Sequence, residues 1–215
     1  MKRIGITQRV EVESEYGERR DCLDQSWASL FKVLEFDLIP IPNNHEDVSL
    51  WAMRMKLDGV VLSGGNDLTH LPNVTNPAPE RDACERNLLS WAANLEIPVL
   101  GVCRGMQMMN YFLGGSIKPV HGHVACKHHV KPCTKNNLFL NYVAVNSFHG
   151  WGIDASNLSS CLMPLLIAED GSVEAFQHES KPWLGIMWHP ERANGHNFIL
   201  DCNLLRELFS DQHKG

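Results

Sequence analysis

Cys103 has the surroundings expected of a reactive cysteine. The apolar stretch 97–101 precedes it, a helix-like stretch follows it, and Gly101 and Gly105 flank it at two residues on either side. A tight turn from strand to helix lifts a side chain above a sheet, and a helix N-terminus favours a thiolate. The amide of Arg104, at that terminus, can donate to an oxyanion. The pattern is typical of a cysteine nucleophile, and the alternative is a buried, unreactive thiol.

A histidine and a glutamate follow a later apolar stretch. Residues 184–188 end at His189, and Glu191 comes two residues later. Residues two apart in an extended chain lie on the same face, so Glu191 can orient His189 as a base for the cysteine. Pro190 between them lacks an N–H group and restricts the backbone. The alternative is an ordinary surface histidine, since the chain has eleven.

Other polar groups also follow apolar stretches. The Ser-Gly-Gly sequence at 63–65 can expose a backbone N–H at Gly65 as a second oxyanion donor, although ordinary turns also need such glycines. Gln107 comes four residues after Cys103, on the same face of a helix, and can contact a polar substrate group. Residues 146–149 form either a pocket wall or an ordinary exit from a strand.

Alternating strands and helices are needed to position these groups. Apolar periodicity predicts strands at 3–7, 36–41, 59–62 and 97–101, and helices at 23–34, 44–56, 80–94 and 104–113. Residues 116–136 are expected to form loops and short ribbons, followed by strands at 138–146, 165–168, 173–177 and 184–188 and a helix at 197–208. This order predicts an α/β fold with a doubly wound, mostly parallel sheet, whose ligands bind at the carboxyl ends of the strands. No repeat or linker interrupts the chain, so we expect a single domain over residues 1–215.

Composition narrows the function classes. The chain has 215 residues, 19 Lys and Arg against 25 Asp and Glu, and a net charge of −6, which argues against general nucleic-acid or anionic-membrane binding. No apolar run approaches the roughly 20 residues of a membrane span. Seven cysteines, an odd number, favour reduced thiols in the cytoplasm over a disulfide framework. We expect a small-molecule substrate and either a monomer or a homodimer.

Four motifs together resemble those of a known family. They are Gly-Val-Cys-Arg-Gly-Met-Gln at 101–107, Ser-Gly-Gly-Asn-Asp at 63–67, Val-Asn-Ser-Phe-His at 145–149 and Trp-His-Pro-Glu at 188–191. They are similar to motifs of the class I glutamine amidotransferases, and within them of the stand-alone γ-glutamyl hydrolases, to which Glu-Arg-Asp at 80–82 also points. The resemblance runs from about Lys2 to the last helix. It implies a flavodoxin-like fold and cleavage of a γ-glutamyl amide bond without a cofactor or metal.

The resemblance also implies roles for individual residues. Cys103 would form a glutamyl thioester, His189 would move the proton, and Glu191 would orient His189. The backbone amides of Gly65 and Arg104 would form the oxyanion hole. Further residues would bind substrate, partly through the main chain: Gln107, Asn146, Ser147, Phe148, His149, Arg19 and Arg20.

The leaving group is the least determined part of the substrate. The chain resembles in particular hydrolases that release a nitrogen carried on cytidine diphosphate, in capsular polysaccharide modification. The loop Gln8–Asp21 supports this, because Arg9, Arg19 and Arg20 can meet a diphosphate and Tyr16 can stack on a base or cover the mouth of the site. Four glutamates in the same loop could instead neutralise these arginines: Glu11, Glu13, Glu15 and Glu18. The alternatives are hydrolysis of γ-glutamyl-γ-aminobutyrate in polyamine catabolism, or a glutaminase subunit that feeds ammonia to a synthetase partner.

Two features depart from the family pattern. Gly150 stands where many members have a second histidine after His149. The segment 121–133 is rich in metal-ligating residues: His121, His123, Cys126, His128, His129 and Cys133. Their spacing fits no standard zinc motif, so we expect contact of one or two histidines with substrate and no metal site. A non-enzymatic metal-binding or scaffold protein is the third class of function, and the presence of Cys103, His189 and Glu191 together argues against it.

Overall fold

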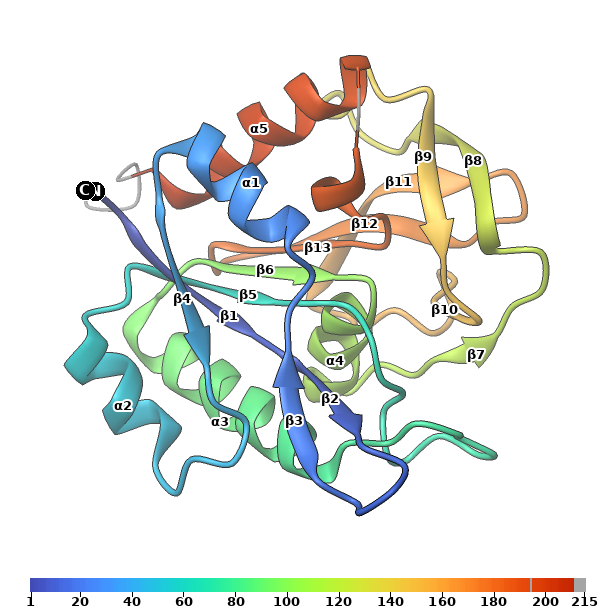
Figure 1. Ribbon diagram of the computed structural model, residues 1–215. Coiled ribbons are helices and arrows are strands. Elements are labelled where there is room, and N and C mark those ends of the chain that lie inside the picture. The colour runs from blue at the N-terminus through green and yellow to red at the C-terminus, as the bar shows by residue number, and fades with distance from the viewer. Residues whose placement is uncertain (194, 211–215) are drawn as a thin grey trace.

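The computed structural model describes residues 1–193 and 195–210, and its frame is a nine-stranded sheet of order β4-β1-β5-β6-β13-β12-β11-β8-β9 (Figure 1). The parallel half contains β4 (Asp37–Ile41), β1 (Arg3–Thr7), β5 (Gly59–Leu62), β6 (Val99–Val102) and β13 (Trp183–Ile186). The antiparallel half contains β12 (Val173–His178), β11 (Leu162–Ala168), β8 (Val124–Pro132) and β9 (Ala144–Phe148). The predicted α/β class is confirmed, with antiparallel strands completing the sheet.

Helices cover both faces of the parallel half, which explains its apolar strands without alternation. One face packs against α1 (Ser26–Leu34) and α5 (Gly195–Phe209), through a core that includes Phe31 and Leu205 (Figure 1). The other packs against α2 (Val48–Met55), α3 (Pro79–Leu95) and α4 (Arg104–Phe112), through a core that includes Leu88 and Met109. Among the helices described, none combines the length and the apolar character needed to cross a bilayer.

The register of the parallel strands brings the sequence motifs to one edge. Gly101 of β6 pairs with Leu62 of β5 on one side and with Gly185 of β13 on the other. Three neighbouring strands therefore end at the same edge of the sheet. Their exits begin the Ser-Gly-Gly loop at 63–65, the turn at Cys103 and the segment that carries His189.

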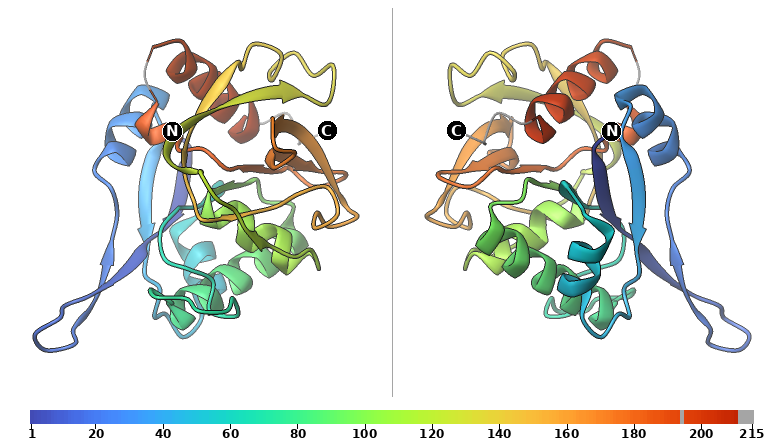
Figure 2. Two further views of the ribbon diagram at one scale, coloured as in Figure 1. Left: turned by 90° about the vertical axis from the view of Figure 1, so that its right-hand side faces the viewer. Right: turned by 90° about the vertical axis from the view of Figure 1, so that its left-hand side faces the viewer.

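Three segments differ from the sequence-based expectation. The predicted strand at 138–146 is wrong in its first half: residues 138–142 form turns, held by hydrogen bonds from the Leu138 and Phe139 amides to Asn136. The segment 116–136, expected as loops and short ribbons, contains the nine-residue strand β8 and the short strand β7 (Lys118–Pro119), which pairs with β10 (Trp151–Gly152). The loop 8–21 is a hairpin of β2 (Arg9–Val12) and β3 (Arg19–Cys22) that projects from the body of the molecule (Figure 2).

Candidate active site

Cys103 occupies a strained turn between β6 and α4. Its backbone has φ 51° and ψ −106°, a conformation that non-glycine residues rarely adopt. Its amide donates to the carbonyl of Ile186 on β13 at 2.8 Å, which ties the turn to the neighbouring strand. A Cβ at Gly105 would lie 2.0 Å from the Leu62 carbonyl oxygen, so only glycine lets α4 approach β5 this closely. The glycine two residues after the cysteine therefore allows the turn to form.

His189 and Glu191 lie on one side of the short helix η1 (Pro190–Arg192), directly after β13. The His189 Nδ1 atom is 2.7 Å from Glu191 Oε1, and both side chains are buried. A carboxylate accepts, so Nδ1 carries the proton and Nε2 remains to exchange a proton with the thiol. Burial alone would lower the pKa of His189, but hydrogen bonds and charge interactions with Cys103 and Glu191 outweigh it and raise that pKa to about 9. The structure thus brings Cys103, His189 and Glu191 together.

The loop after β5 packs directly on this group. A Cβ at Gly64 would lie 2.7 Å from His189 Cε1 and 3.6 Å from the Cβ of Cys103, so a side chain at position 64 would displace the histidine. Gly65 is the next residue, and Arg104 directly follows Cys103. The two predicted oxyanion donors therefore come from backbone segments that adjoin the thiol and the imidazole.

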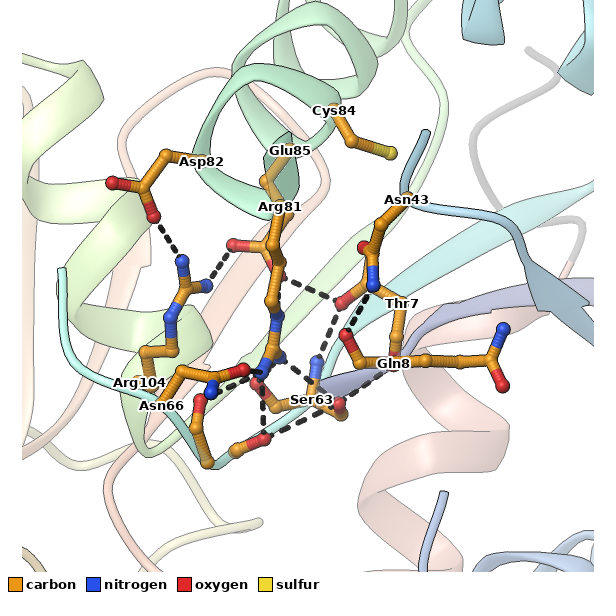
Figure 3. A network of polar contacts seen from close by, with 12 residues as sticks. Thr7, Gln8, Asn43, Ser63, Asn66, Arg81, Asp82, Cys84, Glu85 and Arg104 are labelled. Atoms are coloured by element: carbon orange, nitrogen blue, oxygen red, sulfur yellow. Dashed lines mark hydrogen bonds and ion pairs between the residues drawn. The ribbon is translucent and has the colours of Figure 1, made fainter. Parts of the chain in front are cut away.

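A buried arginine holds the carbonyl groups of this loop (Figure 3). The Arg81 guanidinium of α3 donates to the carbonyls of Ser63 at 2.5 Å, Gly64 at 3.1 Å and Gly65 at 2.6 Å. Its Nε donates to Glu85 at 2.9 Å, one turn along the same helix. Turning these carbonyls toward Arg81 fixes the orientation of the loop beside Cys103.

Arg104 completes the same network from α4. Its guanidinium contacts Asp82 and Glu85, and Thr7 donates to Glu85 at 2.8 Å (Figure 3). Burial raises the pKa of Glu85, but the charges of Arg104 and Arg81 outweigh burial, and the net shift is downward. Sequence reasoning missed this network. Its only trace in the sequence is the four-residue spacing of Arg81 and Glu85, and that spacing gives no sign of which way the pair faces.

The predicted substrate-contacting residues of β9 divide between its two faces. Asn146 clamps the His189 backbone, because its Nδ2 donates to the His189 carbonyl and its Oδ1 accepts from the His189 amide, each at 2.9 Å. The Phe148 ring lies edge-on to His189, with centroids 5.7 Å apart. Ser147 faces the other way and donates to the His123 carbonyl at 2.7 Å. Asn146 and Phe148 thus adjoin the catalytic candidates, whereas Ser147 could reach a substrate there only through its main chain.

Gln107 and His149 meet at one carbonyl group. The Gln107 amide nitrogen and the His149 Nδ1 atom each lie 2.9 Å from the Trp151 carbonyl oxygen. Gln107 is buried on α4, four residues from Cys103, as predicted. A substrate role for His149 stays a prediction, because its ring is buried among other histidines.

The arginines of the β2–β3 hairpin pair with carboxylates. Arg19 contacts Glu80 at 2.5 Å, and Arg20 contacts Glu18 at 2.7 Å and Glu13 at 3.4 Å. These pairs match the neutralised arrangement that the sequence left open, and substrate contact by Arg19 and Arg20 stays a prediction.

Arg9 lies nearer the catalytic candidates than its sequence position alone indicates. A Cβ at Gly65 would lie 3.1 Å from Arg9 Cδ and 3.2 Å from Arg9 Cβ, so the Arg9 side chain packs over the oxyanion loop. Its Nε is 2.8 Å from Glu11, and the side chain is 40% exposed. Arg9 is therefore the hairpin cation best placed to meet a group bound at Gly65.

Comparisons with known proteins agree with this geometry. The sequence profile of the peptidase C26 family matches residues 3–191. The γ-glutamyl-CDP-amidate hydrolase of Campylobacter jejuni is 39% identical over 210 residues, which cover 96% of this chain and 97% of that protein. The glutamine-hydrolysing component of the GMP synthase of Methanococcus vannielii is 32% identical over 141 residues, 63% of this chain and 65% of that protein. A glutamine amidotransferase from Thermotoga maritima, at 19% identity, superposes with a TM-score of 0.65 over 96% of this chain and 83% of that chain, which supports the fold.

Proposed function

The chain belongs to the peptidase C26 family of class I glutamine amidotransferase-like hydrolases, and on this premise we propose that it cleaves a γ-glutamyl amide bond with a Cys103–His189–Glu191 triad. The observation that carries the proposal is the linkage of a cysteine in a strained strand-to-helix turn to a buried histidine, itself 2.7 Å from a buried glutamate. A nucleophile, a base and a group that orients the base are the parts that covalent acyl transfer needs.

Each residue has one step in the proposed reaction. The Cys103 thiolate attacks the γ-carbonyl carbon, and the backbone N–H groups of Gly65 and Arg104 stabilise the oxyanion. Imidazolium His189 then protonates the leaving nitrogen, so the amine departs and a glutamyl thioester remains. Neutral His189 next removes a proton from water, which attacks the thioester and releases glutamate and the Cys103 thiol. Glu191 keeps the proton of His189 on Nδ1 throughout.

The proposed substrate is γ-glutamyl-CDP-amidate, with cytidine diphosphoramidate as the product used in capsular polysaccharide modification. Two observations support it. The similarity to the C. jejuni hydrolase spans nearly the whole of both chains. In addition, the half-exposed Arg9 packs against Gly65, where a guanidinium can pair with a phosphate of the leaving group.

A panel of substrates tests the proposal. Glutamate release is measured from γ-glutamyl-CDP-amidate, γ-glutamyl-γ-aminobutyrate, a γ-glutamyl dipeptide and glutamine. Preference for the nucleotide would support the full proposal. Preference for γ-glutamyl-γ-aminobutyrate would keep the mechanism and overturn the leaving group. Release from none of them, with glutaminase activity appearing only with a synthetase partner, would identify an ammonia-supplying component instead.

The pH dependence tests the role of Glu191. We expect kcat/KM of the wild type to fall as pH rises through about 9, where His189 loses the proton that the leaving nitrogen needs. Replacing Glu191 with glutamine removes a negative charge that raises this pKa, so the alkaline limb should move to lower pH, with a lower maximum. An unmoved limb in Glu191→Gln would contradict the assignment, because a merely structural glutamate would lower activity equally at all pH values.

Arg9→Ala tests recognition of the leaving group. A charge-assisted hydrogen bond contributes about 1.5–3 kcal/mol, so kcat/KM for γ-glutamyl-CDP-amidate should fall about tenfold or more while γ-glutamyl-γ-aminobutyrate is spared. Arg20→Ala is the matched control on the same hairpin, and its pairing with Glu13 and Glu18 predicts a smaller loss. Equal losses on both substrates in Arg9→Ala would remove the argument for a phosphate contact.

A further inference from the structure

Beside the active-site candidates lies a cluster of three histidines and a glutamate that no step of the proposed reaction uses. One ligating atom from each of His123, His128, His149 and Glu174 lies within 4.8 Å of the other three. They come from four separate segments: the residue before β8, β8 itself, the residue after β9, and β12. We propose that these four residues bind a divalent transition metal ion, with Zn²⁺ as the occupant that their chemistry favours.

The hydrogen bonds of two histidines leave their lone pairs facing each other. His149 Nδ1 is 2.9 Å from the Trp151 carbonyl, which can only accept, so this nitrogen carries the proton and Nε2 is bare. His123 Nε2 is 2.8 Å from Asp170, so its proton belongs there and Nδ1 is bare. The two bare nitrogens, His123 Nδ1 and His149 Nε2, are 3.4 Å apart. Two neutral imidazoles in this arrangement need a cation between their lone pairs.

Glu174 adds an unpartnered carboxylate to the same place. It is fully buried, and neither of its side-chain oxygens has a hydrogen-bond partner among the described residues. Its Oε1 is 3.8 Å from His149 Nε2. A buried carboxylate without a partner is costly, and a metal ion that it coordinates removes that cost.

Distances and outer contacts fit a zinc site. Tetrahedral Zn²⁺ with bonds of about 2.0–2.1 Å separates its ligand atoms by roughly 3.3–3.4 Å, close to the 3.4 Å between the two bare nitrogens. Histidines that bind zinc usually donate their other N–H to a carboxylate or a backbone carbonyl, as His123 does to Asp170 and His149 to Trp151. His128 is only half-buried, and its side of the cluster offers a route of entry from solvent.

The proposed metal would fasten the β8–β9 ribbon to the central sheet. β9 also carries Asn146, which holds the His189 backbone on both sides. The ion would therefore be a structural one that keeps this clamp in place. The inference does not depend on the proposed substrate, and its test measures metal binding rather than turnover.

The experiment titrates metal-free protein with Zn²⁺ in competition with a chromophoric chelator, and separately with Co²⁺. The full chain carries Cys103→Ala, which removes the catalytic thiol as a ligand. We expect one high-affinity Zn²⁺ per chain, a rise in Tm on binding, and the intense visible absorption of tetrahedral Co²⁺ with nitrogen and oxygen ligands. Glu174→Gln and His128→Gln in this background should each weaken Zn²⁺ binding by at least about tenfold, and Asp170→Asn by about 10–100-fold.

Two comparisons separate metal from proton. His129→Gln, the exposed histidine beside His128, should bind Zn²⁺ like its parent. Glu174→Gln also keeps the size and neutrality of a protonated glutamate, so it should fold if the cluster merely shares a proton. High-affinity binding that Glu174→Gln and His128→Gln leave unchanged would overturn the proposal, and so would the absence of high-affinity Zn²⁺ binding to the parent.

Discussion

Replacing Cys103 with alanine is expected to reduce glutamate release by a factor on the order of 10⁴ to 10⁶, the range seen when a catalytic nucleophile is removed. The substitution removes only the sulfur. Alanine keeps the Cβ, so the backbone at φ 51° is neither relieved nor further strained, and the amide bond to Ile186 at 2.8 Å remains. Stability should therefore change little while turnover disappears. The measurement is kcat on the preferred substrate of the panel, together with Tm of the same preparations.

Cys84→Ala is the matched control. Cys84 is also buried, but burial above all raises the pKa of its thiol to about 12, so it remains protonated at neutral pH. It lies on α3 and has no place in the proposed reaction. Activity close to wild type in Cys84→Ala, and none in Cys103→Ala, is the expected pair of results. Retained turnover in Cys103→Ala would exclude the thioester mechanism.

The second large effect is expected at Arg81, which positions the oxyanion loop without touching substrate. Arg81→Met leaves the carbonyls of Ser63, Gly64 and Gly65 without their donor, and leaves Glu85 with one cation fewer in a fully buried site. Removing one partner of a buried ion pair costs about 3–5 kcal/mol. At roughly 2–4 °C per kcal/mol for a chain of this size, Tm should fall by about 6–20 °C.

Two further variants separate charge from geometry. Arg81→Lys keeps the charge beside Glu85, but one ammonium cannot reproduce the spread of the guanidinium, so more stability should return than kcat. Lys118→Met breaks the exposed pair with Asp154, where about 1 kcal/mol or less is expected. If Lys118→Met and Arg81→Met lowered Tm equally, the buried network would not have the role described here.

The parallel half of the sheet and the motifs at its edge were predictable because both depend on local sequence. Apolar runs such as 59–62 and 97–101 identify strands buried on both faces, and each motif directly follows one of them. Cys103 and His189 could therefore be assigned to one edge although 86 positions separate them. The parallel pairing of β6 with β13 then places the two side by side.

The remaining parts depend on contacts that the sequence does not express locally. The run 138–146 is apolar enough for a strand, yet Phe139 and Tyr142 reach the core from turns, three residues apart rather than two. Arg81 and Glu85 are typical of an exposed helix face by spacing, and only the folded chain shows that they are buried. His149 and Glu174 likewise join the histidine-rich segment only when β8, β9 and β12 assemble. Long-range packing decided all three.

The β2–β3 hairpin lies outside the nine-stranded sheet and projects away from it, yet its first residue packs on the oxyanion loop (Figure 2). Bond cleavage and leaving-group recognition are thus assigned to separately folded parts, one made of core strands and the other of a surface turn. Surface turns tolerate insertions, deletions and substitutions that a core strand does not. A lineage with this architecture can acquire a new leaving group by remodelling a dozen peripheral residues, while the machinery that breaks the amide bond is inherited unchanged.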